Sequence, residues 1–297
     1  MAVSTSSKAF TAAKAQLVAS GYLANKPVVT DEEATRAVMR FQQRAQTKYR
    51  LCRGIPAQTA AVFTGNVNAE LDEATLAELT RWAAEGWSAP IGYFNITPML
   101  GGGLREDVFA EWTKVETTVA GLGGTISGPY GNTKRALGKA KKSCASSFSF
   151  HTMGRAIDLP QERGGGRAQQ YYVAKEAGSD GTYWRIYCKT DKQDASQGTL
   201  FEKGSINYQN FSPLKEVALP KGYYLDITLA ITQGGKFERI KAQSGWEAVL
   251  DRAEWWHFQF APDKQPSFLM ECELIGYGEA DLLRAGYAQD DLDHKPG

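Results

Sequence analysis

The chain has 297 residues, of which 42% are hydrophobic and 23% charged, and this is enough for one large domain or two ordinary ones. Its 34 Lys and Arg residues nearly balance its 33 Asp and Glu residues, so the formal net charge is +1. This balance gives no electrostatic reason to expect nucleic acid or an anionic membrane as a partner. The composition also excludes a disordered chain, a collagen-like chain and a disulfide miniprotein.

The sequence contains no obvious targeting or membrane segment. No apolar run is long enough to span a bilayer, so membrane insertion is not expected. Residues 1–26 lack the apolar core and cleavage site of a secretory signal, which predicts synthesis in the cytoplasm without such a signal. The cysteines are far apart, which favours reduced structural roles, with one or two disulfides as the alternative in an oxidising compartment. They are Cys52, Cys144, Cys188 and Cys272.

Residues 8–86 predict three helices. The first ends at Gly21, a plausible C-terminal cap. Thr30 and Glu33 have the spacing of a capping box that opens the second, and Asp72 or a neighbour caps the third. The apolar faces that these helices would bury are Phe10, Ala13, Leu17 and Val18, then Ala34, Ala37, Val38 and Phe41, then Leu76, Leu79 and Trp82.

The order of these helical pieces resembles the type 1 peptidoglycan-binding domain. The pieces that carry the resemblance are Leu17 with Gly21-Tyr22, the run Ala37-Val38-Met39-Arg40-Phe41-Gln42-Gln43, and Gly65 with Leu71-Asp72, Thr75-Leu76 and Leu79. The resemblance covers about the first third of the chain and implies a domain over residues 1–88 that binds bacterial peptidoglycan. The stretch 44–64 departs from the family pattern, and the alternative is a helical bundle that only packs on its neighbour.

The remaining two thirds of the sequence contain strand patterns as well as helix patterns. Gly and Pro residues predict a linker over 89–103, and a helix follows from about 105 to 120. Residues 223–231 predict a strand that forms a hairpin with 236–240, and 253–260 contains another aromatic strand. Because helices and strands do not alternate regularly, an α+β fold is favoured over a doubly wound sheet.

Two of the three histidines lie in segments rich in reactive residue types. A catalytic zinc needs three nitrogen or oxygen ligands and an open fourth position, and His151, Asp158 and His257 supply that set. Glu254 could take the proton from the water at such a centre. In a strand, residues three apart point to opposite faces, so Glu254 and His257 share a site only if the backbone bends between them. Taken alone, each histidine segment is also typical of a polar pair at the surface or of a buried histidine whose hydrogen bonds are satisfied.

Together the two segments match a known family. Ser-x-His-x-x-Gly-x-Ala-x-Asp at 149–158, followed by Glu-x-Trp-His at 254–257, resembles the zinc D-Ala-D-Ala carboxypeptidase family. Its relatives include vancomycin-resistance dipeptidases, phage L-alanyl-D-glutamate endolysins and the hedgehog signalling domain. The match covers roughly residues 104–275. It implies a zinc domain over 104–297 with a central antiparallel sheet flanked by helices.

The resemblance also implies roles for individual residues. His151, Asp158 and His257 would bind one Zn²⁺ ion, and Glu254 would be the catalytic base. The family uses an Arg upstream of the first ligand to bind the scissile carbonyl or a substrate carboxylate. Arg135 fits this position best, with Arg155 and Arg105 as rivals. The residues expected to support or line the substrate site are Ser149, by hydrogen bonding, and Trp255 and Trp256.

These features predict a zinc-dependent peptidoglycan hydrolase of the D,D-carboxypeptidase or D,D-endopeptidase type. The alternatives are an L-alanyl-D-glutamate or other stem-peptide endopeptidase, a non-catalytic zinc-stabilised wall-binding protein, and a cytosolic D-Ala-D-Ala dipeptidase. A wall enzyme without a signal would reach the periplasm or the exterior after phage lysis, as an endolysin, or by specialised secretion, as an antibacterial effector. The second route would add delivery machinery and an immunity protein as partners. The long interval between Asp158 and Glu254 predicts an insertion that builds walls of the substrate groove.

Overall fold

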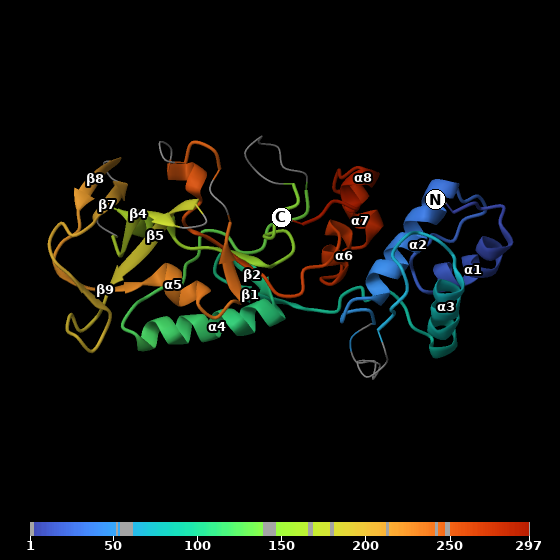
Figure 1. Cartoon of the computed structure of the whole chain (residues 1–297), viewed down its shortest axis with the longest axis horizontal. Coiled ribbons are helices and arrows are strands. Elements are labelled where there is room, and N and C mark those ends of the chain that lie inside the picture. Colours follow the sequence, from blue (N-terminus) through green and yellow to red (C-terminus); the bar gives the residue numbers. More distant parts are fainter. Residues whose placement is uncertain are drawn as a thin grey trace. The chain divides into compact units, whose positions relative to one another are not determined.

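The computed structural model of the chain describes residues 3–51, 53, 62–138, 147–165, 169–178, 181–211, 214–240, 243–246 and 250–296 (Figure 1). Cys52 and Cys144 therefore lie outside the described residues, as does the loop containing Gly54 and Pro56. Among the helices that the structure describes, none is both long and apolar enough to cross a membrane.

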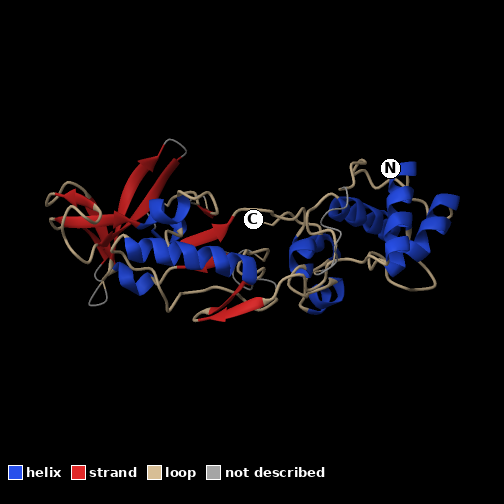
Figure 2. Ribbon diagram, turned by 90° about the horizontal axis from the view of Figure 1, so that it is seen from below, coloured by secondary structure: helices blue, strands red, loops and turns tan. Residues whose placement is uncertain are grey.

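The chain folds into two compact units. Unit 1 consists of Met1–Asn95, Gly138–Lys141 and Gln265–Pro296, and unit 2 of Ile96–Leu137 and Lys142–Lys264, with Gly297. All of the described strands belong to unit 2, as Figure 2 shows in red. Their pairings are all antiparallel, and helices accompany them, so the predicted α+β class is confirmed.

The three helices predicted at the start of unit 1 are present as α1 (Lys8–Ala19), α2 (Asp31–Ala45) and α3 (Glu73–Glu85). The capping box of α2 forms as predicted, because Thr30 Oγ1 accepts from the Glu33 amide and the Glu33 carboxylate accepts from the Thr30 amide at 2.9 Å. The core of these helices contains most of the predicted apolar faces, including Phe10, Ala13, Leu17, Ala34, Ala37, Val38, Phe41, Leu79 and Trp82.

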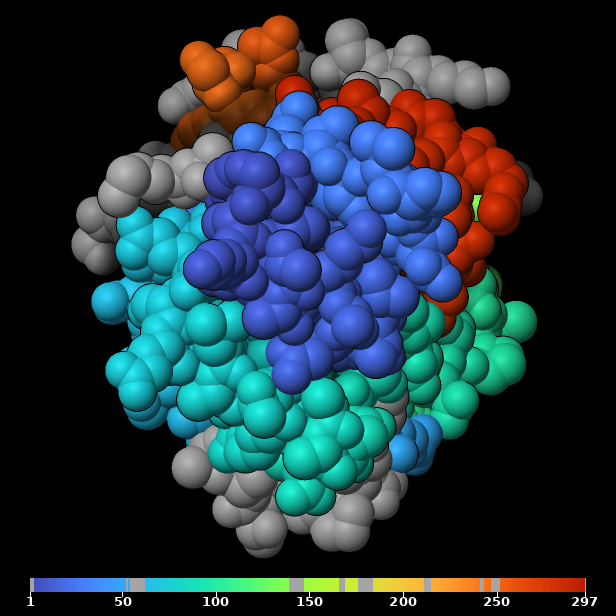
Figure 3. Space-filling view, turned by 90° about the vertical axis from the view of Figure 1, so that its right-hand side faces the viewer, coloured from blue at the N-terminus to red at the C-terminus, as the bar shows by residue number. Residues whose placement is uncertain are grey.

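Three short helices complete unit 1: α6 (Phe268–Glu273), α7 (Glu279–Arg284) and α8 (Gln289–Leu292). The sequence predicts that residues beyond 104 form one domain, and the structure differs here. In Figure 3 the red C-terminal residues lie against blue residues of the N-terminal segment. The difference arises because side chains far apart in the sequence pair with one another. No local sequence pattern indicates such pairing.

Two buried arginines of α2 make these long-range contacts. Arg44 donates to the Glu273 carboxylate at 2.7 Å and to the Met270 carbonyl at 2.7 Å. Arg40 donates to the carboxylates of Glu279 and Asp293, each at 2.9 Å. These ion pairs fix the last described helices on α2, which places residues 265–296 in unit 1.

The predicted linker over residues 89–103 is structured along its length. Ala89 is buried in the core of unit 1, and the Phe94 amide donates to the Leu274 carbonyl at 2.7 Å. The Gly-rich part forms a hairpin of β1 (Ile96–Met99) and β2 (Gly102–Arg105). Its glycines serve the tight turn, where Gly101 has a φ of +99°. The boundary between the two units, at Asn95 and Ile96, lies within the predicted linker, but its residues form turns and a hairpin because Gly and Pro favour turns as well as linkers.

Unit 2 begins with this hairpin and the predicted helix, α4 (Glu106–Gly121). A three-stranded sheet follows in the order β10 (Phe237–Arg239), β11 (His257–Phe260) and β3 (Ala156–Asp158). The core around it includes Trp112, Ile157, Trp255 and Phe258. Short 3₁₀ turns, η2 (Gln161–Gly164) and η4 (Leu250–Ala253), follow β3 and precede β11.

The interval between Asp158 and Glu254 contains a second sheet of six strands. Its order is β6 (Thr199–Phe201), β9 (Gly222–Asp226), β5 (Gly181–Lys189), β4 (Tyr171–Gly178), β7 (Asn207–Phe211) and β8 (Leu214–Ala218). Helix α5 (Ile227–Thr232) then contacts β5 and α4 (Figure 1).

The hairpin predicted from residues 223–231 and 236–240 is wrong. The strand ends at Asp226, whose carboxylate accepts from the Leu229 amide at 2.8 Å and starts α5. Strands β9 and β10 then belong to different sheets. A short apolar run fits a buried helix as well as a strand, so the periodicity could not separate the two.

Candidate metal centre

The three-stranded sheet of unit 2 places two of the predicted ligands directly opposite each other. Asp158 ends β3 and His257 begins β11, and the two residues are antiparallel partners in register. His151 precedes β3 by one turn, in which the Gly154 amide donates to the His151 carbonyl at 3.1 Å. Gly154 has a φ of +66°, a conformation that favours glycine, and so allows this turn.

The donor atoms of these three residues converge. His151 Nε2 lies 3.1 Å from Asp158 Oδ1 and 3.2 Å from His257 Nδ1, and the last two atoms are 3.0 Å apart. All three residues are buried, with exposed fractions of 1%, 3% and 6% in chain order. The group could hold a metal ion.

A contact behind His151 decides which of its ring nitrogens is available. His151 Nδ1 lies 2.6 Å from the backbone carbonyl of Thr133, which can only accept a hydrogen bond. Nδ1 therefore carries a proton, and in a neutral imidazole Nε2 then presents a lone pair. That lone pair points at a carboxylate oxygen and at a second histidine nitrogen. Metal-binding histidines are commonly oriented by such a carbonyl.

The spacing of the donors fits a small cation. Three donors of a tetrahedral zinc, at bond lengths of about 2.0–2.1 Å, lie roughly 3.3 Å from one another. The observed separations of 3.0–3.2 Å are close to this value. Two imidazole nitrogens and one carboxylate oxygen are also a donor set that zinc accepts. The residues therefore fit the zinc ion that the sequence predicts.

The electrostatics of Asp158 favour its ionised form. Burial acts to raise its pKa, but the interactions of the carboxyl with the neighbouring rings of His151 and His257 outweigh this and hold its pKa well below the usual range. Its second oxygen accepts from Asn132 Nδ2 at 3.3 Å. The carboxylate thus keeps its negative charge, which a cation at the centre requires.

Glu254 lies at the bend that the sequence analysis required. Its φ of +40° is unusual for a residue other than glycine, and the His257 amide donates to the Glu254 carbonyl at 2.9 Å. The backbone turns over residues 254–257 before β11 begins, so Glu254 and His257 are not constrained to opposite faces of a strand. The half-buried Glu254 carboxylate accepts from Gln243 Nε2 at 3.2 Å.

The three arginines considered for substrate binding have different surroundings. Arg105 is fully buried and pairs with both carboxylate oxygens of Asp107, at 2.7 and 2.9 Å. Arg155 is fully buried and donates to the carbonyls of Phe260 and Pro262. Arg135 is half-buried, and its amide donates to the His151 carbonyl at 3.1 Å. Structural contacts therefore hold Arg105 and Arg155, whereas Arg135 adjoins a predicted ligand.

The other predicted site residues also differ in their burial and their contacts. Ser149 Oγ accepts from the His151 amide at 3.2 Å and so supports the turn that carries this ligand. Trp255 is 1% exposed and belongs to the core of unit 2, so it cannot line a groove as the sequence analysis expected. Trp256 is half-buried and packs against that core, with its ring 5.6 Å from the Trp255 ring. Of two adjacent Trp side chains, one faces the core and the other faces away from it. The sequence alone does not indicate which of the two faces the core.

Sequence reasoning missed Thr133 and Asn132, which contact predicted ligands, and Gln243, which contacts the predicted base Glu254. Thr133 contributes only a backbone carbonyl, for which no sequence signal exists. Asn132 and Gln243 reach the site across 26 and 11 residues of sequence. A polar residue near a predicted Arg would have been a weak signal for Asn132.

Two cysteines, Cys188 and Cys272, lie among the described residues, and both are buried. Burial raises the pKa of Cys188, which favours its neutral form. His294, the third histidine, is exposed, with Nδ1 at 2.9 Å from the Lys295 carbonyl.

The chain was compared with protein-family models, with curated proteins and with solved structures, and none of the three comparisons found a match.

Proposed function

We propose that this chain is a zinc-dependent peptidoglycan hydrolase that cleaves peptide bonds of the stem peptide, as a D,D-carboxypeptidase or D,D-endopeptidase. The observation that supports this most strongly is the buried convergence of His151, Asp158 and His257, with Glu254 on the turn that leads into the last of them. In this proposal unit 2 has the fold of the D-Ala-D-Ala carboxypeptidase family with a six-stranded insertion. The N-terminal helices of unit 1 bind the cell wall.

The chemistry assigns a task to each polar group. A zinc ion held by His151, Asp158 and His257 supplies a Lewis acid for amide hydrolysis. The Thr133 carbonyl orients His151, and Asn132 orients Asp158. The Glu254 carboxylate accepts the proton of the attacking water and returns it to the leaving amine.

A second group of residues orients the base and the substrate. Gln243 donates to the Glu254 carboxylate and so restricts the directions in which it can point. Arg135, next to His151 along a backbone hydrogen bond, would bind the scissile carbonyl or a substrate carboxylate. In this arrangement the half-buried, bent position of Glu254 argues for catalysis over wall binding alone, because binding needs no base.

The test is mass spectrometry of purified peptidoglycan fragments after incubation with the zinc-loaded full chain. The substrates are a pentapeptide fragment, a tetrapeptide fragment and a crosslinked dimer. Loss of a terminal D-Ala or opening of the dimer is expected. A cut between L-Ala and D-Glu would instead support the endopeptidase alternative.

Two variants control this experiment. Glu254→Ala should keep its zinc and lose about 10²–10⁴-fold in turnover, because a positioned general base is removed. Glu111→Ala, on α4, removes a carboxylate outside the site and should retain full activity. No cleavage of any fragment by a protein with one bound zinc would refute the hydrolase proposal. Full activity of Glu254→Ala would refute the assignment of the base.

A further inference from the structure

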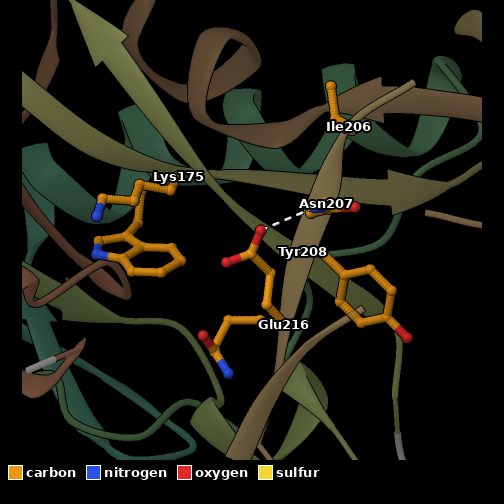
Figure 4. A pocket seen from close by; sticks show the side chains of 7 residues that line it. Lys175, Ile206, Asn207, Tyr208 and Glu216 are labelled. Atoms are coloured by element: carbon orange, nitrogen blue, oxygen red, sulfur yellow. Dashed lines mark hydrogen bonds between the residues drawn. The ribbon is translucent and has the colours of Figure 1, made fainter. Parts of the chain in front are cut away.

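The six-stranded sheet of unit 2 carries a pocket of its own. Its volume is about 440 Å³, within the size range of small-molecule sites. None of the predicted catalytic or metal-binding residues lines it. The lining residues, drawn in Figure 4, are Lys175, Trp184, Ile206, Asn207, Tyr208, Gln209 and Glu216.

Strand register explains why most of these side chains meet. Lys175 on β4 is the antiparallel partner of Trp184 on β5, and Gln209 on β7 is the partner of Glu216 on β8. Partners in register project from the same face of a sheet. Asn207 is two residues from Gln209 and shares that face. Four neighbouring strands thus build one polar wall, and Figure 4 shows Tyr208 pointing to the other side of β7.

The polar groups of this wall are mixed in type and balanced in charge. Lys175 contributes one positive charge and Glu216 one negative charge, and Asn207 and Gln209 add neutral amides. Asn207 Nδ2 donates to Glu216 Oε1 at 2.8 Å, which fixes this carboxylate at the pocket. A hydroxyl group both donates and accepts, so a ligand rich in hydroxyls and amides matches this set. A strongly charged ligand would leave one of the two ionic groups facing a like charge.

Trp184 contributes apolar surface to the pocket. Its side chain is 6% exposed and belongs to the core of unit 2. It therefore adds an aromatic ring to the polar wall that its neighbours form.

A short turn connects this pocket with the candidate base. The Trp246 ring lies 6.3 Å from the Trp184 ring, and Lys175 Nζ lies 5.3 Å from its centroid. The Trp246 amide donates to the Gln243 carbonyl at 3.1 Å, and the Gln243 side chain donates to Glu254. One turn of four residues therefore contacts the pocket wall at one end and Glu254 at the other.

We propose that this pocket binds a neutral N-acetylated sugar, the class of sugar that forms the glycan strands of peptidoglycan. The acetamido group and hydroxyls pair with Asn207, Gln209 and Glu216, and Ile206 provides apolar surface for the methyl group. The inference rests on the proposed function only in taking the sugar to be part of the same substrate. Sugar binding itself requires neither zinc nor turnover.

The test is saturation-transfer NMR with the full chain and a tetramer of N-acetylglucosamine, next to a glucose tetramer that lacks the acetamido groups. Binding of the acetylated tetramer alone is expected. Glu216→Ala should weaken it at least about tenfold, because a hydrogen bond to a charged group is lost.

Glu202→Ala is the matched control, because Glu202 follows β6 of the same sheet and pairs at the surface with Lys221. It should bind the tetramer as the wild type does. Circular dichroism melting identifies any variant that fails to fold, and Asn207→Ala then serves as a second probe of the same wall.

Three outcomes would overturn the proposal. The first is no saturation transfer at about 10 mM tetramer, ten times a Kd of 1 mM. The second is equal binding by wild type and Glu216→Ala, which would place the sugar elsewhere on the chain. The third is equal binding of both tetramers. Glu254→Ala should bind the sugar normally, so failure of the hydrolase proposal and failure of this one are distinguishable.

Discussion

The two units of this protein both bury charged side chains, but they satisfy them differently. In unit 1 the guanidinium groups of Arg40 and Arg44 each reach carboxylates of the C-terminal segment, at 2.7–2.9 Å. In unit 2 the ligand atoms of the buried residues His151, Asp158 and His257 all lie within 4.8 Å of one another. The first cluster contains its own counter-charges, whereas the second groups two imidazoles with one carboxylate, a set of side chains that can hold a cation.

This contrast separates a structural cluster from a functional one on physical grounds. A buried charge must be paired or bound to a metal, since desolvation is otherwise too costly. Where the partners are side chains from distant segments, the cluster fixes the fold. Where imidazole and carboxylate groups converge, as in unit 2, a cation can pair with the buried carboxylate. Four predictions test this distinction, in decreasing order of expected effect.

Removing one ligand should have the largest effect. His257→Ala should lose bound zinc and all turnover, because two remaining protein ligands do not hold the ion. At zinc concentrations about 1,000 times the Kd, the lost stabilisation is about 4 kcal/mol, or roughly 10 °C in Tm. Atomic absorption and scanning calorimetry measure the two quantities. A chelator should reproduce the shift in the wild type and leave the variant unchanged, and equal shifts in both would disprove the site.

Breaking the structural cluster should destabilise the protein without touching the metal. Arg44→Ala leaves the Glu273 carboxylate without its partner, which should cost about 3 kcal/mol of the free energy of unfolding. Urea unfolding measures the loss, and zinc content should stay at one ion. The double change Arg44→Met with Glu273→Leu should recover most of the stability. A variant that loses zinc instead would contradict the separation of the two clusters.

Weakening the support of a ligand should have an intermediate effect. Asn132→Ala removes the amide that donates to Asp158 Oδ2 at 3.3 Å, so zinc affinity should fall about tenfold. Competition with a fluorescent zinc chelator measures this change. Lys134→Ala, two residues away, is the control and should leave the affinity unaltered; equal losses in both would mean that the effect is not specific to Asp158.

Removing a helix cap should have the smallest effect. Thr30→Ala deletes the side chain that accepts from the Glu33 amide, which should cost about 1 kcal/mol of stability. Thr30→Ser retains the hydroxyl and should lose much less. Both variants should bind zinc as the wild type does, and thermal melting should rank them in this order.

The features that the sequence predicts correctly depend mainly on residues that are close together in the chain. The capping box of α2 depends on residues three apart, and the apolar face that contains Val38 and Phe41 follows helical spacing. The convergence of His151 with His257 was inferred from residue types and a family resemblance, since the two residues are 106 positions apart. Few residue types bind metal ions, so a few positions in the sequence are enough to predict a set of metal ligands.

The parts that could not be predicted depend on long-range contacts. Nothing near Arg44 indicates that Glu273 will be its partner, so the C-terminal segment was assigned to the wrong unit. Residues 223–231 are mostly apolar, and the cap at Asp226 divides them into a strand and a helix. Trp255 and Trp256 are equivalent in the sequence, and their different burial follows from how the turn after Glu254 enters β11.

The placement of residues 265–296 in unit 1 has a consequence for how the chain is made. Unit 2 is almost continuous from residue 96 to 264, so a ribosome releases nearly all of it before α6 emerges. The helices α1–α3 of unit 1 are synthesised before unit 2, but unit 1 cannot complete its ion pairs until later. Arg40 pairs with Asp293, which is 253 residues further along the chain. During synthesis the N-terminal helices therefore keep two unpaired arginines until the final stretch is translated. In the order of assembly, unit 2, which carries the candidate metal centre, is therefore complete before unit 1.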